Sequence, residues 1–551
     1  MAPIPLPLRS LGQRMLTLLA GLLAGAIAAI VMTLAMAASR YWLGIMPPVE
    51  AVPDRIARML DIDSFFSLFG KYGGYNGLKK FGIVSGLRGV FGVGLVVGLV
   101  YALIIESASS RRSRRWLFGA STPALIFLAV ASLAAWIGLV VFLWPVLPAN
   151  YRGLPYSWAR LATIAALFIW IALFSGTLML VYRAITLRIV PITNGQTADP
   201  VDRPVSRILP RRAFLAVAGG AALTIPIYRL LRTMYNDATF PYDGTVYSGE
   251  DIEPVTPTDR FYTVTKNVVD PDVYRDIWRL EIGGHVDNSL SLSFDDLKQF
   301  EQVDQETTLM CISNRIGAGL FSNANWKGVR LRDVLESAGI RDGAHETVLT
   351  GADAYRDTFP IEKALEESTL LVYQINGEPL PRVHGYPVRA IVPGMFGEKN
   401  VKWITRVDVA TEDVQGFYEQ QGWGPNFEPY TRSDIFDPRT VLQGGSFSFR
   451  QQFPANQPVE IRGRAFAGDR GISSIDISTD GGETWTRAEI YYAGTRLTWS
   501  LWRYRWTPPK SGEYVITTRA FDAAGEPQTQ EVRGIVPQGA SGYHKVTMTV
   551  L

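Results

Sequence analysis

The sequence predicts a multi-domain protein with an N-terminal α-helical transmembrane bundle, an α+β domain and a C-terminal all-β sandwich. Uncharged apolar runs gather in residues 1–230, mixed helix and strand patterns fill 252–431, and alternating strand patterns fill 432–551. We place a linker at 231–251. Charge divides the chain in the same way. Residues 1–230 hold 22 basic and 7 acidic side chains (+15), whereas the remainder holds 32 and 44 (−12). The acidic second part argues against nucleic-acid binding, which uses a basic face.

The apolar runs predict about five membrane-spanning helices. A span needs about 20 apolar residues. The fifth run is short and ends in Pro226, and the second is long enough only if it begins near Phe81. The runs lie at about 15–38, 89–105, 117–144, 161–182 and 213–228. The chain therefore meets membrane lipid.

Loop charge predicts the orientation of these helices. Arginines precede the first run and fill 111–115 and 183–212, whereas 145–160 holds only two. Because basic loops stay in the cytoplasm, we expect a cytoplasmic N-terminus. A fifth crossing then places the second half on the periplasmic side of a cell inner membrane. The loop 39–80 opposes this orientation, with six basic and four acidic residues. We expect an amphipathic helix around Asp54–Phe69 within it.

The segment that opens the fifth run resembles a twin-arginine export signal. It reads Pro210-Arg211-Arg212-Ala213-Phe214-Leu215, with Pro210 in place of the usual Ser or Thr. An ordinary positively charged flank of a membrane helix explains the arginine pair equally well. No small-residue cleavage site follows, so we expect the run to remain as an anchor.

The bundle itself lacks the residues of redox or proton transfer. A membrane haem usually takes histidine ligands, and the four histidines all lie in the second half, at 285, 345, 384 and 544. The apolar runs also contain no Asp or Glu, which a proton path would need. We therefore expect no haem, and a bundle that anchors the chain or docks a partner. A quinone pocket in the bundle is the alternative, for which the sequence offers no supporting residue.

Short strands and helices alternate in the α+β domain. Residues 277–282 alternate like a strand. Ser293 precedes an acidic first helical turn, as an N-cap does. A further helix is expected from Val329 onward, with Gly339 as its stop. This mixture is typical of an α+β fold.

The last 120 residues read as strands only. Alternating stretches occur at 459–466, 474–478, 499–506, 514–520 and 530–536. Asp480-Gly481-Gly482 supplies a hairpin turn. Strands at this spacing predict an immunoglobulin-like sandwich.

Cys311 is the single cysteine, which excludes an internal disulfide, a Cys-rich zinc site and an iron–sulfur cluster. A lone cysteine is most often a small buried apolar residue. Asn314 and Arg315 follow it, however, and a nearby arginine favours the thiolate that ligates metals. A thiolate suits a redox-active metal. One thiolate cannot hold a metal alone, so a cofactor would supply the other ligands.

Three basic or donor side chains, His384, Arg389 and Lys402, lie within 19 positions of one another. The glycines and prolines between them indicate stiff turns. Such a group suits a phosphate. Taken singly, each residue is also explained as a surface charge or a core histidine.

Together with Tyr355-Arg356-Asp357 and Trp326-Lys327-Gly328, these segments resemble the sulfite oxidase family of molybdopterin enzymes, over about 252–551. The resemblance includes a dimerisation-type sandwich. It implies a molybdenum held by a pyranopterin dithiolene and by the thiolate of Cys311. It further implies an active-site role for Tyr355, contacts to the pterin and its phosphate from His384, Arg389 and Lys402, and a pocket shaped by Asn314 and Arg315.

The chain departs from sulfite oxidases proper beside this site. Ile316 stands where they carry a second arginine, and Thr265-Lys266-Asn267 stands where they carry Arg-Asn-His. Lys266 and Arg315 remain as candidate catalytic cations. Because sulfite is a small dianion that needs several converging cations, sulfite is a doubtful substrate. The periplasmic branch that includes methionine sulfoxide reductases departs similarly.

We therefore predict a membrane-anchored molybdenum oxidoreductase that moves an oxygen atom to or from a small sulfur- or nitrogen-containing substrate. Electrons would be exchanged with a separate carrier: a cytochrome, a haem membrane subunit or a quinone. A homodimer through the sandwich is expected. The alternative is a non-catalytic extracytoplasmic binding module. A transporter is disfavoured because the bundle lacks repeats and intramembrane charge.

Overall fold

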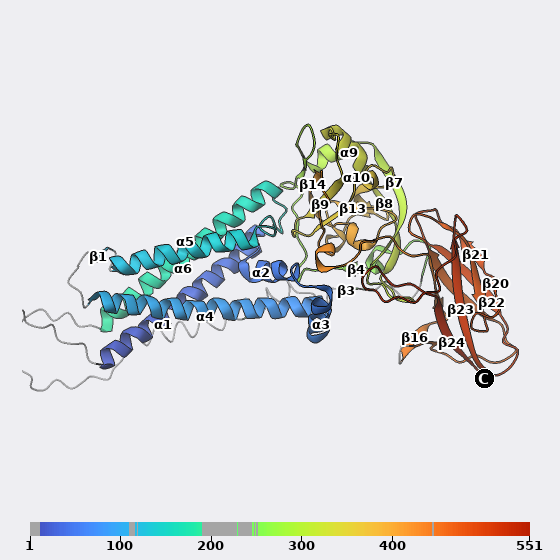
Figure 1. The fold of residues 1–551 in the computed structure, drawn as a ribbon, viewed down its shortest axis with the longest axis horizontal. Helices are drawn as coiled ribbons and strands as arrows, with labels where there is room; N and C mark the ends of the chain where they lie inside the picture. Colours follow the sequence, from blue (N-terminus) through green and yellow to red (C-terminus); the bar gives the residue numbers. More distant parts are fainter. Residues whose placement is uncertain are drawn as a thin grey trace, which may run out of the picture.

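The computed structural model describes residues 11–109, 116–117, 120–189, 229, 245–246, 248, 252–443 and 446–551. Three parts follow one another along the long axis: a helical bundle, a mixed α and β part, and a β-rich part at the far end (Figure 1). The fifth apolar run and the Arg211-Arg212 pair lie outside the described residues.

Four helices of the bundle are long and apolar enough to cross a membrane. They are α1 (Leu11–Ala38), α4 (Tyr75–Ser109), α5 (Thr122–Leu143) and α6 (Tyr156–Ile189). A π-helical turn (Ser39–Leu43), α2 (Pro48–Ala57) and α3 (Ile62–Tyr72) lie between α1 and α4, and β1 (Trp116–Leu117) and β2 (Ala120–Ser121) between α4 and α5. Helices α2 and α3 lie at the end that meets the mixed part, and β1 at the opposite end (Figure 1).

Glycines allow α1 and α4 to touch at their backbones. A Cβ atom on Gly98 would stand 2.2 Å from the carbonyl oxygen of Gly21, and one on Gly25 would stand 2.0 Å from that of Gly94. Small residues let apolar helices approach this closely without a hydrophobic driving force between them. The glycines therefore fix how the bundle packs.

The amphipathic helix expected around Asp54–Phe69 is wrong as a single element, because the helix breaks after α2. Asp61 caps a new helix, α3, through a 2.9 Å hydrogen bond that its carboxylate accepts from the Ser64 amide. Ion pairs also neutralise part of the positive charge of residues 39–80. Arg40 lies 3.1 Å from Glu50, and Lys79 lies 2.8 Å from Asp54.

The mixed part contains two five-stranded sheets in the orders β10-β9-β14-β5-β6 and β12-β11-β8-β7, with β13 added to β11. A core centred on Trp278 lies within this part. Its strands are β3 (Thr245–Val246), β4 (Thr263–Val264), β5 (Leu280–Gly284), β6 (Leu290–Leu292), β7 (Gln302–Met310), β8 (Phe321–Arg330), β9 (Glu346–Gly351), β10 (Arg356–Pro360), β11 (Leu370–Ile375), β12 (Glu378–Pro379), β13 (Arg389–Ile391) and β14 (Ile404–Ala410). Its helices are α8 (Phe294–Leu297), α9 (Leu331–Ala338) and α10 (Ile361–Ala364), with 3-10 turns η2 (Thr258–Arg260), η3 (Arg382–His384), η4 (Gly397–Lys399) and η5 (Glu419–Gln421).

In this part the predicted helix caps are confirmed, whereas the predicted starts of one helix and one strand are shifted by a few residues. Ser293 caps α8 in a reciprocal capping box with Asp296, and Gly339 ends α9 at φ 74°. The helix expected from Val329 begins at Leu331 instead, because β8 continues to pair with β11 through Arg330. The strand expected from 277 begins at Leu280.

The β-rich part forms two sheets in the orders β15-β18-β22-β21 and β16-β17-β24-β23-β19-β20. Buried Ile461, Ile516 and Trp502 belong to one core cluster. The strand expected at 530–536 is wrong: both edges of β23 are taken, by β24 and β19, and only an isolated bridge forms at Arg533. The strands are β15 (Arg432–Asp437), β16 (Thr440–Gln443), β17 (Ser446–Phe449), β18 (Val459–Phe466), β19 (Ile472–Ser478), β20 (Thr486–Arg487), β21 (Glu489–Tyr492), β22 (Ser500–Trp506), β23 (Gly512–Asp522) and β24 (His544–Val550).

The bundle is docked on the mixed part through backbone and side-chain hydrogen bonds. The Asn150 amide donates to the carbonyl of Ala352 at 2.8 Å, and the Asp272 amide donates to that of Tyr151 at 2.8 Å. The Gln421 side chain donates to the carbonyl of Ala57 at 3.1 Å. The end of α2 and the loop between α5 and α6 thus both contact the mixed part.

Candidate functional site

A cavity of about 180 Å³ lies where the loops of the mixed part meet helix α3, and we call it the Cys311 cavity. Six of the eight residues predicted from the sequence line it: Lys266, Cys311, Tyr355, His384, Arg389 and Lys402. They come from segments spread over more than 130 positions, brought together by the two sheets. The structure therefore builds one site from them.

The other two predicted residues lie off the cavity wall. Asn314 is buried and accepts a 2.9 Å hydrogen bond from the Leu320 amide, which shapes the loop after Cys311. Arg315 is exposed, and its backbone carbonyl accepts a hydrogen bond from Arg432 at 3.0 Å. The guanidinium of Arg315 is therefore not placed to meet a group bound in the cavity.

Cys311 follows the last residue of β7 and is 6% exposed. Its sulfur lies 3.1 Å from the Ser313 hydroxyl. Burial raises the pKa of the thiol to about 11, and the nearby carboxyl of Glu398 adds to this rise. The expectation that Arg315 favours the thiolate is thus wrong, because that arginine is exposed and burial dominates. A coordinated metal ion, in contrast, removes the thiol proton outright.

Tyr355 contributes a phenol held by two acceptors. Its hydroxyl donates to the Asp357 carboxylate at 2.6 Å and lies 3.2 Å from the carbonyl of Glu398. Burial and the charge of Asp357 raise the pKa of the phenol well above its usual value, so it stays protonated. Lys399 in turn lies 2.8 Å from Asp357 and fixes that carboxylate.

Arg389 is buried and Lys402 is half-buried, and neither has an acidic partner at ion-pair distance in the described part of the chain. Arg389 donates to the carbonyls of His384 and Asn400, both at 3.2 Å, and Lys402 to those of Val264 and Val383, at 3.2 and 3.0 Å. Burial lowers the pKa of Arg389 to about 10 and that of Lys402 to about 8. A bound anion would stabilise the charged forms of both side chains and so raise both pKa values again.

His384 completes this basic end as a neutral donor or acceptor. Its Nε2 lies 3.2 Å from the Thr258 carbonyl. Burial, together with the charges of Arg389 and Lys402, lowers the pKa of the imidazole to about 3. The ring therefore adds hydrogen bonding without adding charge.

Lys266 is engaged by two carboxylates. Its ammonium group lies 3.2 Å from the Asp54 carboxylate of α2 and 3.7 Å from that of Asp353. Its side chain is 8% exposed. The two acids compensate its charge, so Lys266 offers a small anion less attraction than an unpaired lysine would.

The cavity also has walls that the sequence did not predict. Phe65, Phe66 and Phe69 of α3 line it, and the Phe66 ring packs 5.7 Å from that of Trp423. Glu398 lines it too, and burial with the charge of Asp357 raises the pKa of this carboxyl to about 8. The aromatic spacing in α3 is the only local signal for the first group, and it equally fits a membrane-surface helix.

Comparison with known proteins matches both parts of the second half. A family model described as "Oxidoreductase molybdopterin binding domain" matches residues 267–418, and one described as "Mo-co oxidoreductase dimerisation domain" matches 448–550. Sulfite oxidase of Gallus gallus is 30% identical over 321 residues, covering 51% of this chain and 69% of that protein. An uncharacterised oxidoreductase, YuiH of Bacillus subtilis, is 32% identical over 163 residues, covering 29% and 80%. The chain belongs to the sulfite oxidase family of molybdopterin-dependent oxidoreductases.

This family member spans only part of its longer relatives. It is 31% identical to mitochondrial sulfite oxidase of Rattus norvegicus over 346 residues, which covers 54% of this chain and 62% of that protein. Among solved structures it is similar to the sulfane dehydrogenase SoxCD of Paracoccus pantotrophus, with a TM-score of 0.49, 24% identity, and coverage of 55% and 85%.

The residues present fit the molybdopterin group that the family implies. A buried thiol and two cations without a carboxylate partner, the buried Arg389 and the half-buried Lys402, meet in one cavity, as suits a metal with an anionic organic ligand. No group of three or more His, Cys, Asp and Glu side chains suited to a metal occurs in the described chain.

Proposed function

We propose that the chain is a membrane-anchored molybdenum oxidoreductase that transfers an oxygen atom to or from a small sulfur- or nitrogen-containing substrate. The observation that carries this proposal is that the Cys311 thiol shares one cavity with Arg389 and Lys402, two cations that have carbonyl partners but no carboxylate at ion-pair distance. Two neighbouring cations withdrawn in part from water are costly without an anion beside them. A pterin phosphate supplies that anion.

Each residue has a defined task in this proposal. Cys311 would ligate the metal, Arg389 and Lys402 would bind the phosphate, and His384 would hydrogen-bond the pterin. When bound, the molybdenum–pterin group supplies two-electron oxygen-atom transfer. Tyr355 stays protonated, and its hydroxyl could donate to the reacting oxygen if it exchanged its hydrogen bond to Asp357 for that contact. Glu398, whose pKa is raised to about 8, can give or take a proton at the cavity wall.

The cavity favours a substrate less charged than sulfite. The cation of Lys266 is compensated by two acids, Arg315 is exposed, and Ile316 is apolar. The rings of Phe65 and Phe66 form an apolar wall instead. We infer a neutral sulfoxide or N-oxide, or its reduced form, with an apolar substituent.

Four apolar helices support a membrane anchor. The loops at 39–74 and 144–155 meet the catalytic part, whereas β1, which follows the arginine-rich segment 111–115 in the sequence, lies at the opposite end (Figure 1). If that segment is cytoplasmic, the catalytic part faces the periplasm. The match to a dimerisation domain supports a homodimer. A non-catalytic binding module is the alternative.

The test is turnover by the full chain, purified from a host that makes the molybdenum cofactor. We expect methyl phenyl sulfoxide reduction with a viologen dye to exceed sulfite oxidation with ferricyanide by at least about tenfold in kcat/KM. Cys311→Ser should abolish both. Arg315→Ala tests the catalytic role predicted for that residue, because an exposed side chain predicts little loss. Sulfite as the better substrate would refute the substrate assignment, and molybdenum-free protein without turnover would favour the binding module.

A further inference from the structure

A second cavity lies inside the helical bundle, and we call it the bundle cavity. Its volume is about 620 Å³, within the range of small-molecule sites. Helices α1, α2, α4, α5 and α6 all line it. Phe81 and Val93 line it and are 46% and 61% exposed, so the cavity is not sealed along α4. An apolar molecule dissolved in the membrane can therefore enter from the side.

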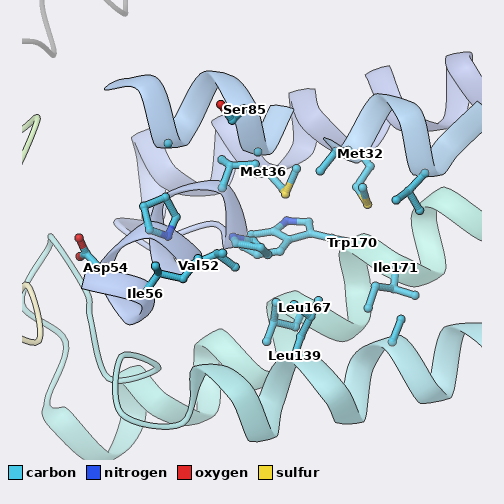
Figure 2. Close-up of a pocket in the computed structure, with 18 of the residues that line it drawn as sticks. Met32, Met36, Val52, Asp54, Ile56, Ser85, Leu139, Leu167, Trp170 and Ile171 are labelled. Carbon is cyan, nitrogen blue, oxygen red and sulfur yellow. The ribbon is translucent and has the colours of Figure 1, made fainter. Parts of the chain in front are cut away.

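The cavity is long, apolar and charged at one end. Asp54 lies at one end, Met32 and Ile171 lie toward the other, and the Trp170 indole lies between them (Figure 2). Lys79 lines the cavity and lies 2.8 Å from Asp54, and both side chains are 3% exposed. Such a site suits a molecule with a polar head and an apolar tail.

The charged end is also the contact with the Cys311 cavity. Asp54 lies 3.2 Å from Lys266, which lines the Cys311 cavity, and Lys266 donates to the carbonyl of Asp353 at 3.0 Å. One carboxylate thus belongs to the wall of one cavity and touches the wall of the other. A head group beside Asp54 and Lys79 would lie next to the proposed redox site.

We propose that the bundle cavity binds a membrane quinone, with its ring toward Asp54 and Lys79, as the electron partner of the catalytic part. This inference rests on the proposed function, which requires an electron carrier. The ring carbonyls accept hydrogen bonds from an ammonium group, and the isoprenoid tail matches the apolar walls. Residues 1–230 hold no histidine for a haem relay. A plain acyl chain would offer no polar group to the Asp54–Lys79 pair at the charged end of the cavity.

The redox chemistry balances with a quinone. When the substrate is oxidised, it takes one oxygen atom from water and releases two electrons and two protons. The quinone accepts both electrons and both protons, and its two carbonyls become the hydroxyls of a quinol. Reduction of a sulfoxide or N-oxide runs both half-reactions backward and forms water.

The test is calorimetric titration of the detergent-solubilised full chain with decylubiquinone. The control is n-decanol, which has the same ten-carbon chain but no quinone ring. Binding needs no turnover, so it is measured on protein with or without molybdenum. We expect one saturable site that n-decanol does not compete for. If wild-type protein fails to turn over with dyes but binds decylubiquinone, the proposed function fails and the quinone site stands. If the wild-type protein turns over with dyes but does not bind decylubiquinone, the quinone site fails and the proposed function stands.

Matched substitutions locate the site. Gly86 lines the cavity, and a Cβ there meets only Val49 at 3.4 Å, whereas Gly89 on the same helix has open space and lies off the cavity. Gly86→Leu should weaken decylubiquinone binding by at least about tenfold, and Gly89→Leu by less than about twofold. The same comparison can be made on α5. Ala131 lines the cavity, so Ala131→Phe should weaken binding, whereas Ala134 does not line it and Ala134→Phe serves as the matched control. Equal affinities within both pairs, or full competition by n-decanol, would overturn the proposal.

Discussion

Asp54 holds the bundle against the catalytic part, and its removal should open the Cys311 cavity. It lies within ion-pair distance of two buried lysines, Lys79 and Lys266, whose side chains are 3% and 8% exposed. Although burial opposes it, the charges of these lysines hold the pKa of Asp54 below its usual value. Removing one partner of a buried ion pair costs about 3 to 5 kcal/mol. Asp54→Asn keeps the shape and part of the hydrogen bonding, so we expect about 3 kcal/mol.

The single cysteine makes this cost measurable. Cys311 is 6% exposed and shares its cavity with the α3 phenylalanines, so in protein produced without the molybdenum cofactor we expect a thiol reagent to react faster when α3 moves away. The labelling rate then follows the opening equilibrium. A loss of about 3 kcal/mol corresponds to labelling about a hundredfold faster. The control is Asp272→Asn, which removes the partly exposed ion pair with Arg152 in the same interface. We expect less than about fivefold from it, because exposed pairs contribute at most about 1 kcal/mol. Equal rates for the two variants would refute the role of Asp54.

Three further predictions concern other parts of the chain. Burial lowers the pKa of His544 to about 4 while its Nδ1 accepts from the Ile435 amide at 2.9 Å, so the unfolded chain binds more protons below pH 6.5. The sandwich should therefore lose up to about 3 kcal/mol of stability between pH 6.5 and 4 in thermal or urea unfolding, and His544→Asn should remove that slope. Gly98→Leu should separate α1 from α4 and lower the SDS concentration at which the bundle unfolds, costing at least about 1 to 3 kcal/mol, whereas Gly92→Leu, with open space around it, should not. Glu398→Gln should remove an ionisation near pH 8 from the kcat/KM profile, and an unchanged profile would exclude this carboxyl as a proton donor.

The sequence predicted the parts of the fold that local chemistry determines. Ser293 and Gly339 act as caps because their side-chain and backbone preferences operate within a few residues. The end of β8 was misjudged because Val329 and Arg330 fit a helical pattern as well as a strand, and the pairing with β11 decides between them. Such pairing is a tertiary contact that no local window contains.

The same distinction separates the predicted from the missed site residues. Cys311, His384, Arg389 and Lys402 lie in separate segments that each resemble the family, and the structure brings them to one cavity. The contact between Asp54 and Lys266 joins positions 212 residues apart. The sequence around either residue does not indicate the other, so the sequence did not predict that the helical bundle contacts the residues of the site. The exposure of Arg315 likewise depends on the path of the loop, which its residue type does not determine.

The most direct test of the account is X-ray absorption at the molybdenum edge of the purified full chain, beside Cys311→Ser. The account predicts about one molybdenum per chain in the wild type, with one sulfur ligand fewer in the variant. Identical sulfur coordination in the two proteins, or wild-type protein without molybdenum from a host that makes the cofactor, would contradict the assignment of Cys311 as the metal ligand.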